Sequence, residues 1–126
     1  MRYLGVDYGL KKIGLAISQG QLASIYKIVE VNSLTDAVSK ISQIVKDENI
    51  DLVVVGMPEG KTLKIVKNFV NKLKFKNIEV ETFDETLSSV NAKQLMINLN
   101  LSQKERRKED AYAAALILQN FLDTLS

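Results

Sequence analysis

The opening stretch of the chain, residues 3–16, places one acid at the end of a short apolar run. Leu4 to Val6 are apolar or small and lead directly into Asp7. After Gly9, apolar side chains return in alternation from Ile13 to Ile17. This pattern predicts a buried strand, a tight turn and a second strand that folds back beside the first. Asp7 is then either a turn residue or the anchor of a cation site.

The composition indicates one globular domain. The 126 residues are 46% hydrophobic and 25% charged, a balance typical of soluble proteins with a single core. No apolar run approaches the roughly 20 residues that span a bilayer, and the N-terminus lacks the pattern of a signal peptide. We therefore expect a single domain over residues 1–126, located in the cytoplasm and without membrane contact.

The chain contains neither cysteine nor histidine, and this absence narrows its chemistry. Disulfides, thiolate nucleophiles and imidazole bases are excluded, as is a structural zinc site of the Cys/His kind. Catalysis would have to use carboxylates, hydroxyls, lysines or a metal held by oxygen ligands. Ligation by oxygen alone favours Mg²⁺, Mn²⁺ or Ca²⁺.

Hydrophobic periodicity along the chain predicts three strands followed by alternating helices and strands. Ser33 is expected to cap the first helix, with Asp36 three residues later in a position like that of a capping box. The expected strands are residues 4–7, 13–17, 24–31, 52–56 and 78–83, and the expected helices are residues 34–48, 62–73, 86–96 and 109–125.

This order of elements predicts an α/β fold built on a five-stranded mixed sheet flanked by helices. The first three strands would form an antiparallel meander, and the fourth and fifth would run parallel through right-handed crossovers. The first strand would then be central, between the second and the fourth. In open sheets of this kind, sites form at the carboxyl ends of the strands. Asp7, residues 56–58 and residues 84–85 all fall at such ends.

Acids from three parts of the chain are expected to converge at that edge. Asp7 ends the first strand, and Asp84 or Glu85 ends the fifth. Asp110 opens a helix that is otherwise apolar. Acids brought together repel one another unless a cation neutralises them, and a divalent ion held there can support phosphodiester hydrolysis. Each acid also has a structural interpretation as a turn residue or as a favourable charge at a helix N-terminus.

Basic residues gather in two places. Residues 61–76 contain six lysines and no acid, and residues 104–108 read Lys-Glu-Arg-Arg-Lys. The net charge of +2 is by itself too small to indicate nucleic acid binding. The first group is interpreted as a solvated helix face and the second as a loop, although clustered arginines favour phosphate contact.

Four ordered stretches resemble the motifs of the YqgF family, the RuvX-type Holliday junction resolvases and pre-16S rRNA nucleases. They are Gly5-Val-Asp-Tyr-Gly-Leu-Lys-Lys-Ile-Gly-Leu-Ala16, Val53-Val-Val-Gly-Met-Pro58, Asp84-Glu-Thr-Leu-Ser-Ser89 and Lys108-Glu-Asp-Ala-Tyr-Ala-Ala-Ala-Leu-Ile-Leu-Gln119. Together they cover nearly the whole chain. The resemblance implies an RNase H-like fold and a nuclease that depends on Mg²⁺ or Mn²⁺ and acts on structured nucleic acid.

The resemblance also implies roles for individual residues. Asp7, Glu85 and Asp110 match the metal-binding acids of the family, with Asp84 as the alternative at the second position because the register of the fifth strand is open. On this hypothesis the side chains that contact phosphates are Lys12, Arg106, Arg107 and Lys108.

The chain departs from the family pattern at three places. Thr86 stands where the family usually has arginine, Lys12 replaces the commoner arginine, and the loop after Pro58 is shorter. The first two changes remove planar groups that bind phosphate through two nitrogens. These departures bear on substrate binding more than on metal binding.

Three functions are therefore compared. The leading one is a nuclease that processes the 5′ end of pre-16S rRNA in ribosome biogenesis or resolves branched DNA junctions. This nuclease is expected to be a monomer or weak dimer and to bind pre-rRNA in ribosomal particles. A nucleotide-binding phosphotransferase would need two lobes of this fold, and 126 residues supply one. The third is a non-catalytic RNA- or protein-binding module. The sequence shows no element that distinguishes RNA from DNA.

Overall fold

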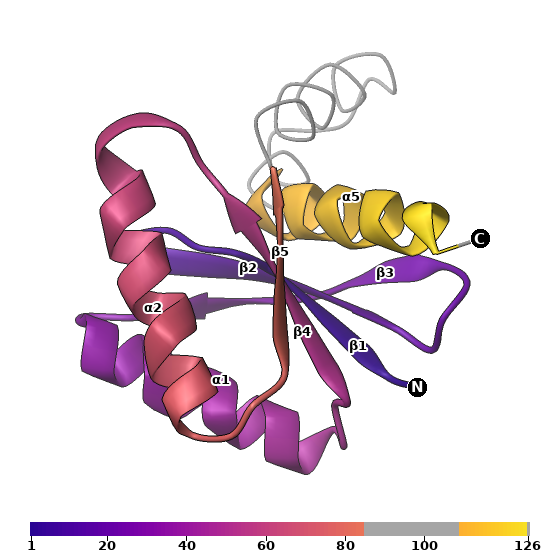
Figure 1. The fold of residues 1–126 in the computed structure, drawn as a ribbon, viewed down its shortest axis with the longest axis horizontal. Coiled ribbons are helices and arrows are strands. Elements are labelled where there is room, and N and C mark those ends of the chain that lie inside the picture. The colour runs from indigo at the N-terminus through magenta and orange to yellow at the C-terminus, as the bar shows by residue number, and fades with distance from the viewer. Residues whose placement is uncertain (85–108, 126) are drawn as a thin grey trace.

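The computed structural model describes residues 1–84 and 109–125, and these residues form a five-stranded mixed sheet (Figure 1). The sheet has the order β3-β2-β1-β4-β5, in which β1 is central. Its first three strands are antiparallel neighbours, while β4 pairs in parallel with both β1 and β5. The strands are β1 Tyr3–Asp7, β2 Lys12–Ser18, β3 Ala23–Glu30, β4 Leu52–Met57 and β5 Val80–Asp84. The predicted meander and parallel pairing are confirmed.

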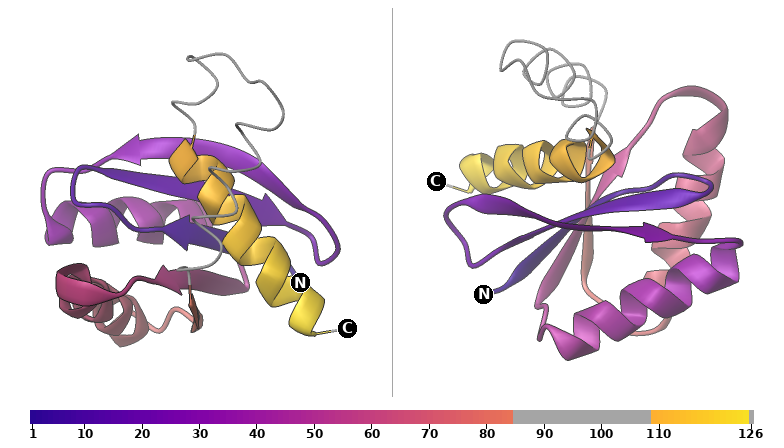
Figure 2. Two further views of the ribbon diagram at one scale, coloured as in Figure 1. Left: turned by 90° about the horizontal axis from the view of Figure 1, so that it is seen from above. Right: turned by 180° about the vertical axis from the view of Figure 1, so that it is seen from behind.

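Helices cover both faces of this sheet (Figure 2). Helices α1 (Leu34–Asp47) and α2 (Leu63–Phe75) lie on one face, and α5 (Glu109–Thr124) lies on the other. A short 3₁₀ turn, Gly60–Thr62, connects β4 to α2. In the described part of the chain, no helix combines the length and the apolar character needed to cross a bilayer.

The start of α1 follows the prediction closely. The hydroxyl of Ser33 accepts a hydrogen bond from the backbone N–H of Asp36 at 3.0 Å. The Asp36 carboxylate in turn accepts from the N–H of Asn32 at 3.1 Å and pairs with Lys40 at 3.2 Å. These contacts, the Asn32 bond first, lower the pKa of Asp36. Ser33 and Asp36 thus fix the helix start, as a capping box does.

The last strand begins later than predicted. The expected strand at 78–83 is observed as Val80–Asp84, because α2 ends with a turn that uses the preceding residues. Asn77 has φ +64°, and the N–H of Ile78 donates to the carbonyl of Leu73 at 3.2 Å. This arrangement closes the helix in a Schellman motif. The expected helix at 86–96 and the expected loop after it lie outside the described residues.

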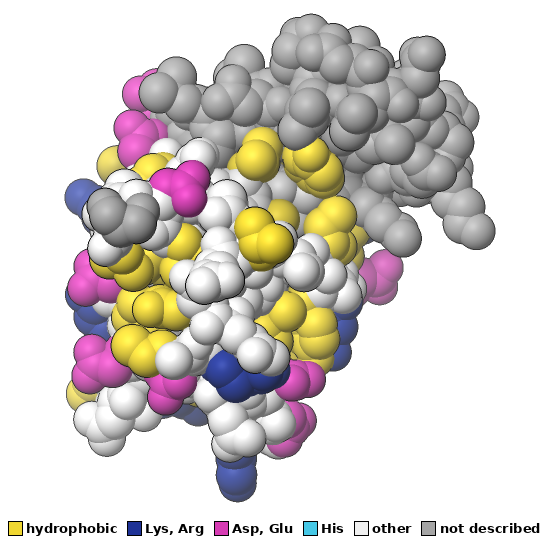
Figure 3. All heavy atoms as spheres, turned by 90° about the vertical axis from the view of Figure 1, so that its right-hand side faces the viewer, with side chains coloured by type: hydrophobic (Ala, Val, Ile, Leu, Met, Phe, Trp, Pro, Cys, Tyr) yellow, Lys and Arg dark blue, Asp and Glu magenta, His cyan; other side chains and the backbone are white. Residues whose placement is uncertain are grey.

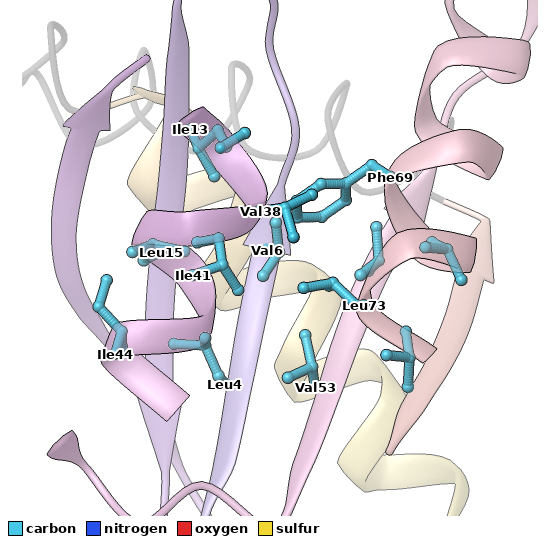
Figure 4. Packing of buried hydrophobic residues seen from close by; sticks show 14 of the residues in the cluster. Leu4, Val6, Ile13, Leu15, Val38, Ile41, Ile44, Val53, Phe69 and Leu73 are labelled. Carbon is cyan, nitrogen blue, oxygen red and sulfur yellow. The ribbon is translucent and has the colours of Figure 1, made fainter. Parts of the chain in front are cut away.

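The larger core lies between the sheet and the helices α1 and α2 (Figure 4). Alternate residues of the central strands meet the apolar stripes of both helices there, as a period of two in strands and 3.6 in helices requires. Each large aliphatic or aromatic side chain that is fully buried there stabilises the fold by about 2 kcal/mol. The fully buried members include Leu4, Val6, Ile13, Leu15, Ile41, Val53, Phe69 and Leu73.

A second core lies between the sheet and α5, and this helix contacts β1 at a glycine. A Cβ atom added to Gly5 would lie 2.8 Å from the backbone oxygen of Ala114 and 2.8 Å from the Cβ of Leu118. Both distances are shorter than carbon contacts allow. Ala114 and Leu118 are themselves fully buried. Gly5 therefore sets how closely the helix can approach the sheet.

The close approach predicts a large penalty for one methyl group. Gly5→Ala is expected to lower the free energy of unfolding by about 1–3 kcal/mol, because the helix backbone would have to move away from β1. Urea denaturation followed by circular dichroism measures this change. Leu22→Ala is the control, since Leu22 is 77% exposed and its truncation is expected to change the free energy of unfolding little. Equal stability of the two variants would contradict the close contact.

Candidate active site

Asp7 ends β1 on the face of the sheet that α5 covers. Its neighbours Val6 and Tyr8 both turn to the opposite face, where Val6 is buried in the core beneath α1 and α2. The ring of Tyr8 packs against that of Phe69 in α2, with 4.7 Å between centroids. Since successive strand residues alternate between faces, the half-buried Asp7 lies on the α5 side.

The turn after Asp7 brings a basic residue to the same place. A Cβ atom on Gly9 would collide with the backbone oxygen of Lys12, so the chain can reverse here only around glycine. Lys12 begins β2 and is exposed. Gly14, two residues further, pairs directly with Asp7 across the two strands. Lys12 therefore shares the face of Asp7 and stands at the same edge of the sheet.

Helix α5 runs antiparallel to β1 and brings its first turn to that edge. Near the start of β1, the rings of Phe121 and Tyr3 have centroids 6.4 Å apart. Two residues after Tyr3 in β1, Gly5 contacts the middle of the helix. Asp7 follows Gly5 by two residues and so lies on the same face of β1. Position 110 lies in the first turn of α5, one helical turn before the contact with Gly5. The backbone of Asp110 thus reaches the level of Asp7.

Asp84, the alternative second acid, lies on the other face of the sheet. It pairs with Met57 at the end of β4, and Met57 packs against the core beneath α1 and α2. The preceding residue Phe83 packs against the α5 core, while Val80 belongs to the opposite one. Alternation from both residues places the exposed Asp84 on the α1/α2 side, away from Asp7.

The structure therefore brings together part of the predicted site. Asp7, Lys12 and the first turn of α5 meet at the carboxyl edge. The other predicted site residues lie outside the described part of the chain; they are Glu85, Arg106, Arg107 and Lys108. Among the residues that the structure does describe, no group of three acids or other metal ligands is found. The donors offered by this chain are carboxylates, which suit Mg²⁺ or Mn²⁺.

Sequence reasoning gave no role to Tyr8, which anchors the end of β1. Its ring holds the turn against α2, and burial of the phenol raises its pKa above the usual 10.0. An aromatic residue directly after a strand-ending acid was the available signal. Because Asp7 is flanked by two side chains fixed in the opposite core, its own direction is constrained.

Comparison with known proteins places this chain in a family. A family model described as "RuvX: Holliday junction resolvase" matches residues 1–124. The chain belongs to the RuvX family. A relative from Endomicrobium trichonymphae, named "Putative pre-16S rRNA nuclease", is 39% identical over 99% of this chain and 97% of its own length.

Solved structures confirm that the RuvX chain has an RNase H-like fold. The fowlpox virus Holliday junction resolvase superposes with a TM-score of 0.66 at 13% identity, covering 100% of both chains. Thermus thermophilus RuvC, solved in complex with a Holliday junction substrate, gives a TM-score of 0.62 at 15% identity, covering 100% of this chain and 96% of that one. At these identities the likeness concerns the fold.

The partly buried ring of Tyr8 predicts a dependence of stability on alkaline pH. A tyrosine whose folded pKa is raised stabilises the fold fully below the unfolded value of 10.0, and this contribution is lost as the pH rises through the folded pKa. Tyr8→Phe is expected to unfold at nearly the wild-type urea concentration at neutral pH and to lose less stability above pH 10.0. Urea midpoints measured across this range test it, and identical alkaline losses in both proteins would contradict it.

Proposed function

We propose that residues 1–126 act as one metal-dependent nuclease domain that hydrolyses phosphodiester bonds in structured nucleic acid. The observation that carries this proposal is the meeting of Asp7 and the first turn of α5 at the carboxyl edge of an RNase H-like sheet. A chain without histidine or cysteine has few other ways to catalyse hydrolysis. Family membership supports the same activity.

The proposed metal ligands are Asp7, Glu85 and Asp110. The position of Asp84 on the α1/α2 side supports the choice of Glu85 as the second acid, since a shared cation needs all its ligands on one face. A bound Mg²⁺ or Mn²⁺ would offset the negative charge of the phosphodiester and activate water for attack. Asp7 is held for this role by its neighbours in the opposite core.

Substrate phosphates would be bound by basic side chains around the same edge. Lys12 is exposed and shares the face of Asp7, which supports its assignment as a phosphate contact. Arg106, Arg107 and Lys108 precede α5 directly in the chain and are proposed to extend this contact. Arginine and lysine neutralise phosphates in a manner that salt weakens.

The proposed substrate is the 5′ end of pre-16S rRNA, bound within ribosomal particles by a monomer or weak dimer. The name of the relative from Endomicrobium trichonymphae supports it. The second candidate is a branched DNA junction, which the description of the family model and the RuvC complex favour.

Substitution of Asp7 tests the proposed catalytic site. Asp7→Asn is expected to reduce cleavage at least 100-fold, because an amide cannot supply the charge that holds the cation, while the circular dichroism spectrum stays unchanged. Asp84→Asn is the matched control and is expected to cut at nearly the wild-type rate. Cleavage is measured with Mn²⁺ on a precursor rRNA end and on a four-way DNA junction.

The outcomes of that assay separate the alternatives. Wild-type cleavage by Asp7→Asn, or an equal loss in both variants, would falsify the assignment of the site. Preference for the junction over the rRNA end would support the resolvase instead. A wild-type protein that binds RNA in EDTA but cuts neither substrate with Mn²⁺ would be a non-catalytic binding module.

The role of Lys12 predicts a change in salt dependence. Lys12→Gln is expected to weaken binding of the uncut substrate in EDTA and to reduce the slope of log affinity against log salt by about one. Lys46→Gln is the control, because Lys46 lies exposed in the last turn of α1, away from the edge. Fluorescence anisotropy at several salt concentrations measures both. Equal slopes for the two variants would remove Lys12 from the interface.

A further inference from the structure

A groove between α1 and α2 lies away from the candidate active site and has the residues of an anion-binding surface. It has a volume of about 790 Å³. Two hydroxyls from α1, two amides and two lysines from the α2 region, and the ring of Phe75 line it together with Val38. The polar lining residues are Thr35, Ser39, Asn68, Asn71, Lys72 and Lys76.

The ring of Phe75 is the unusual member of this α1–α2 groove. Its side chain is 90% exposed, although it ends a helix whose other phenylalanine, Phe69, is fully buried. The buried side of α2 consists of Val66, Phe69, Val70 and Leu73. Phe75 falls on the opposite side of the helix, in line with Asn68 and Asn71, as a period of 3.6 residues requires. Packing of the fold does not use this ring.

The charged side chains that line the groove are both lysines. All six lysines between residues 61 and 76 are exposed, and this stretch contains no acid. Asp36 is near the start of α1, but its carboxylate is engaged by Lys40 and by the N–H of Asn32. Figure 3 shows the side of the molecule turned away from α2, and among the described residues drawn there few side chains are basic. The lysine-rich helix therefore gives the groove a positive potential.

The same helix connects the groove to the candidate active site. Helix α2 follows β4 and the 3₁₀ turn, so it begins at the carboxyl edge where Asp7 lies. It then returns toward the amino edge, because β5 runs parallel to β4. Its 13 residues span about 20 Å. A strand that leaves the α5 face at this edge can thus follow the exposed lysines along α2 to Phe75.

We propose that the α1–α2 groove binds a single-stranded RNA segment of the substrate, with one base stacked on Phe75 and phosphates beside Lys72 and Lys76. Exposed aromatic rings beside lysines bind single strands in this way, because every base has a stacking face and every nucleotide a negative charge. This inference rests on the proposed nuclease function and names where a substrate strand continues beyond the cleaved bond.

The neutral lining favours RNA over DNA. The hydroxyls of Thr35 and Ser39 and the amides of Asn68 and Asn71 can each donate and accept hydrogen bonds. The ribose 2′-hydroxyl, which DNA lacks, is also both a donor and an acceptor. Lysines alone would not distinguish the two nucleic acids, since both carry the same phosphates.

Binding measured without catalysis tests the groove separately from the nuclease. The full chain is titrated in EDTA with a fluorescent single-stranded RNA and with DNA of the same sequence, and anisotropy reports the affinity. Phe75→Ala is expected to weaken RNA binding at least about fivefold. Leu22→Ala is the control, because Leu22 is 77% exposed and lies outside the groove, and it is expected to bind as the wild type does. Thermal melting confirms that each variant is folded.

A charge variant makes the test independent of the aromatic ring. Lys72→Gln is expected to reduce the salt slope for single-stranded RNA by about 0.7, and Lys46→Gln is expected to leave it unchanged. Wild-type affinities for both groove variants would overturn the proposal even if the protein cuts RNA. Equal losses on RNA and DNA would overturn the assignment to RNA. A fivefold loss in a protein whose Asp7 proves irrelevant to cleavage would support the groove and reject the proposed catalytic site.

Discussion

The contact between Gly5 and α5 is the constraint on which the candidate active site depends. Because β1 carries no side chain at this point, the helix backbone lies directly against the central strand. The rings of Tyr3 and Phe121 fix the direction of the helix at the other end of the strand. Together these two contacts determine where the first turn of α5 arrives. A bulkier residue at position 5 would move Asp110 relative to Asp7 without touching either acid.

Alternation along the strands then decides which polar residues can act together. Val6 and Tyr8 enter the core beneath α1 and α2, and this leaves Asp7 on the opposite side. Lys12 shares that side because Gly14 pairs with Asp7. The same rule separates Asp84 from Asp7, although both end strands at one edge. Which polar residues can act together at the candidate active site therefore depends on the face of the sheet where each one lies, as well as on its distance from the others.

Much of this arrangement could be predicted from the sequence, and the exceptions have physical causes. The continuous apolar run from Leu52 to Gly56 indicates a strand buried on both faces, and short turns indicate the meander. The choice between Asp84 and Glu85 could not be made, because it depends on the pairing of β5 with β4. The sequence could predict that Phe75 lies outside the apolar stripe of α2. That α1 does not cover the ring depends on tertiary packing, which the structure shows.

The order of the elements along the chain has a consequence for synthesis on the ribosome. All five strands of the sheet precede α5, so a nascent chain that has emerged only through β5 exposes the apolar surface of Tyr3, Ala16 and Val54 to water. Among the described helices, α5 is the one that covers this surface, when it docks and meets Gly5. An enzyme whose proposed third ligand is Asp110 would stay inactive until the same event. Completion of the core and onset of activity would therefore coincide, and truncated chains would lack both.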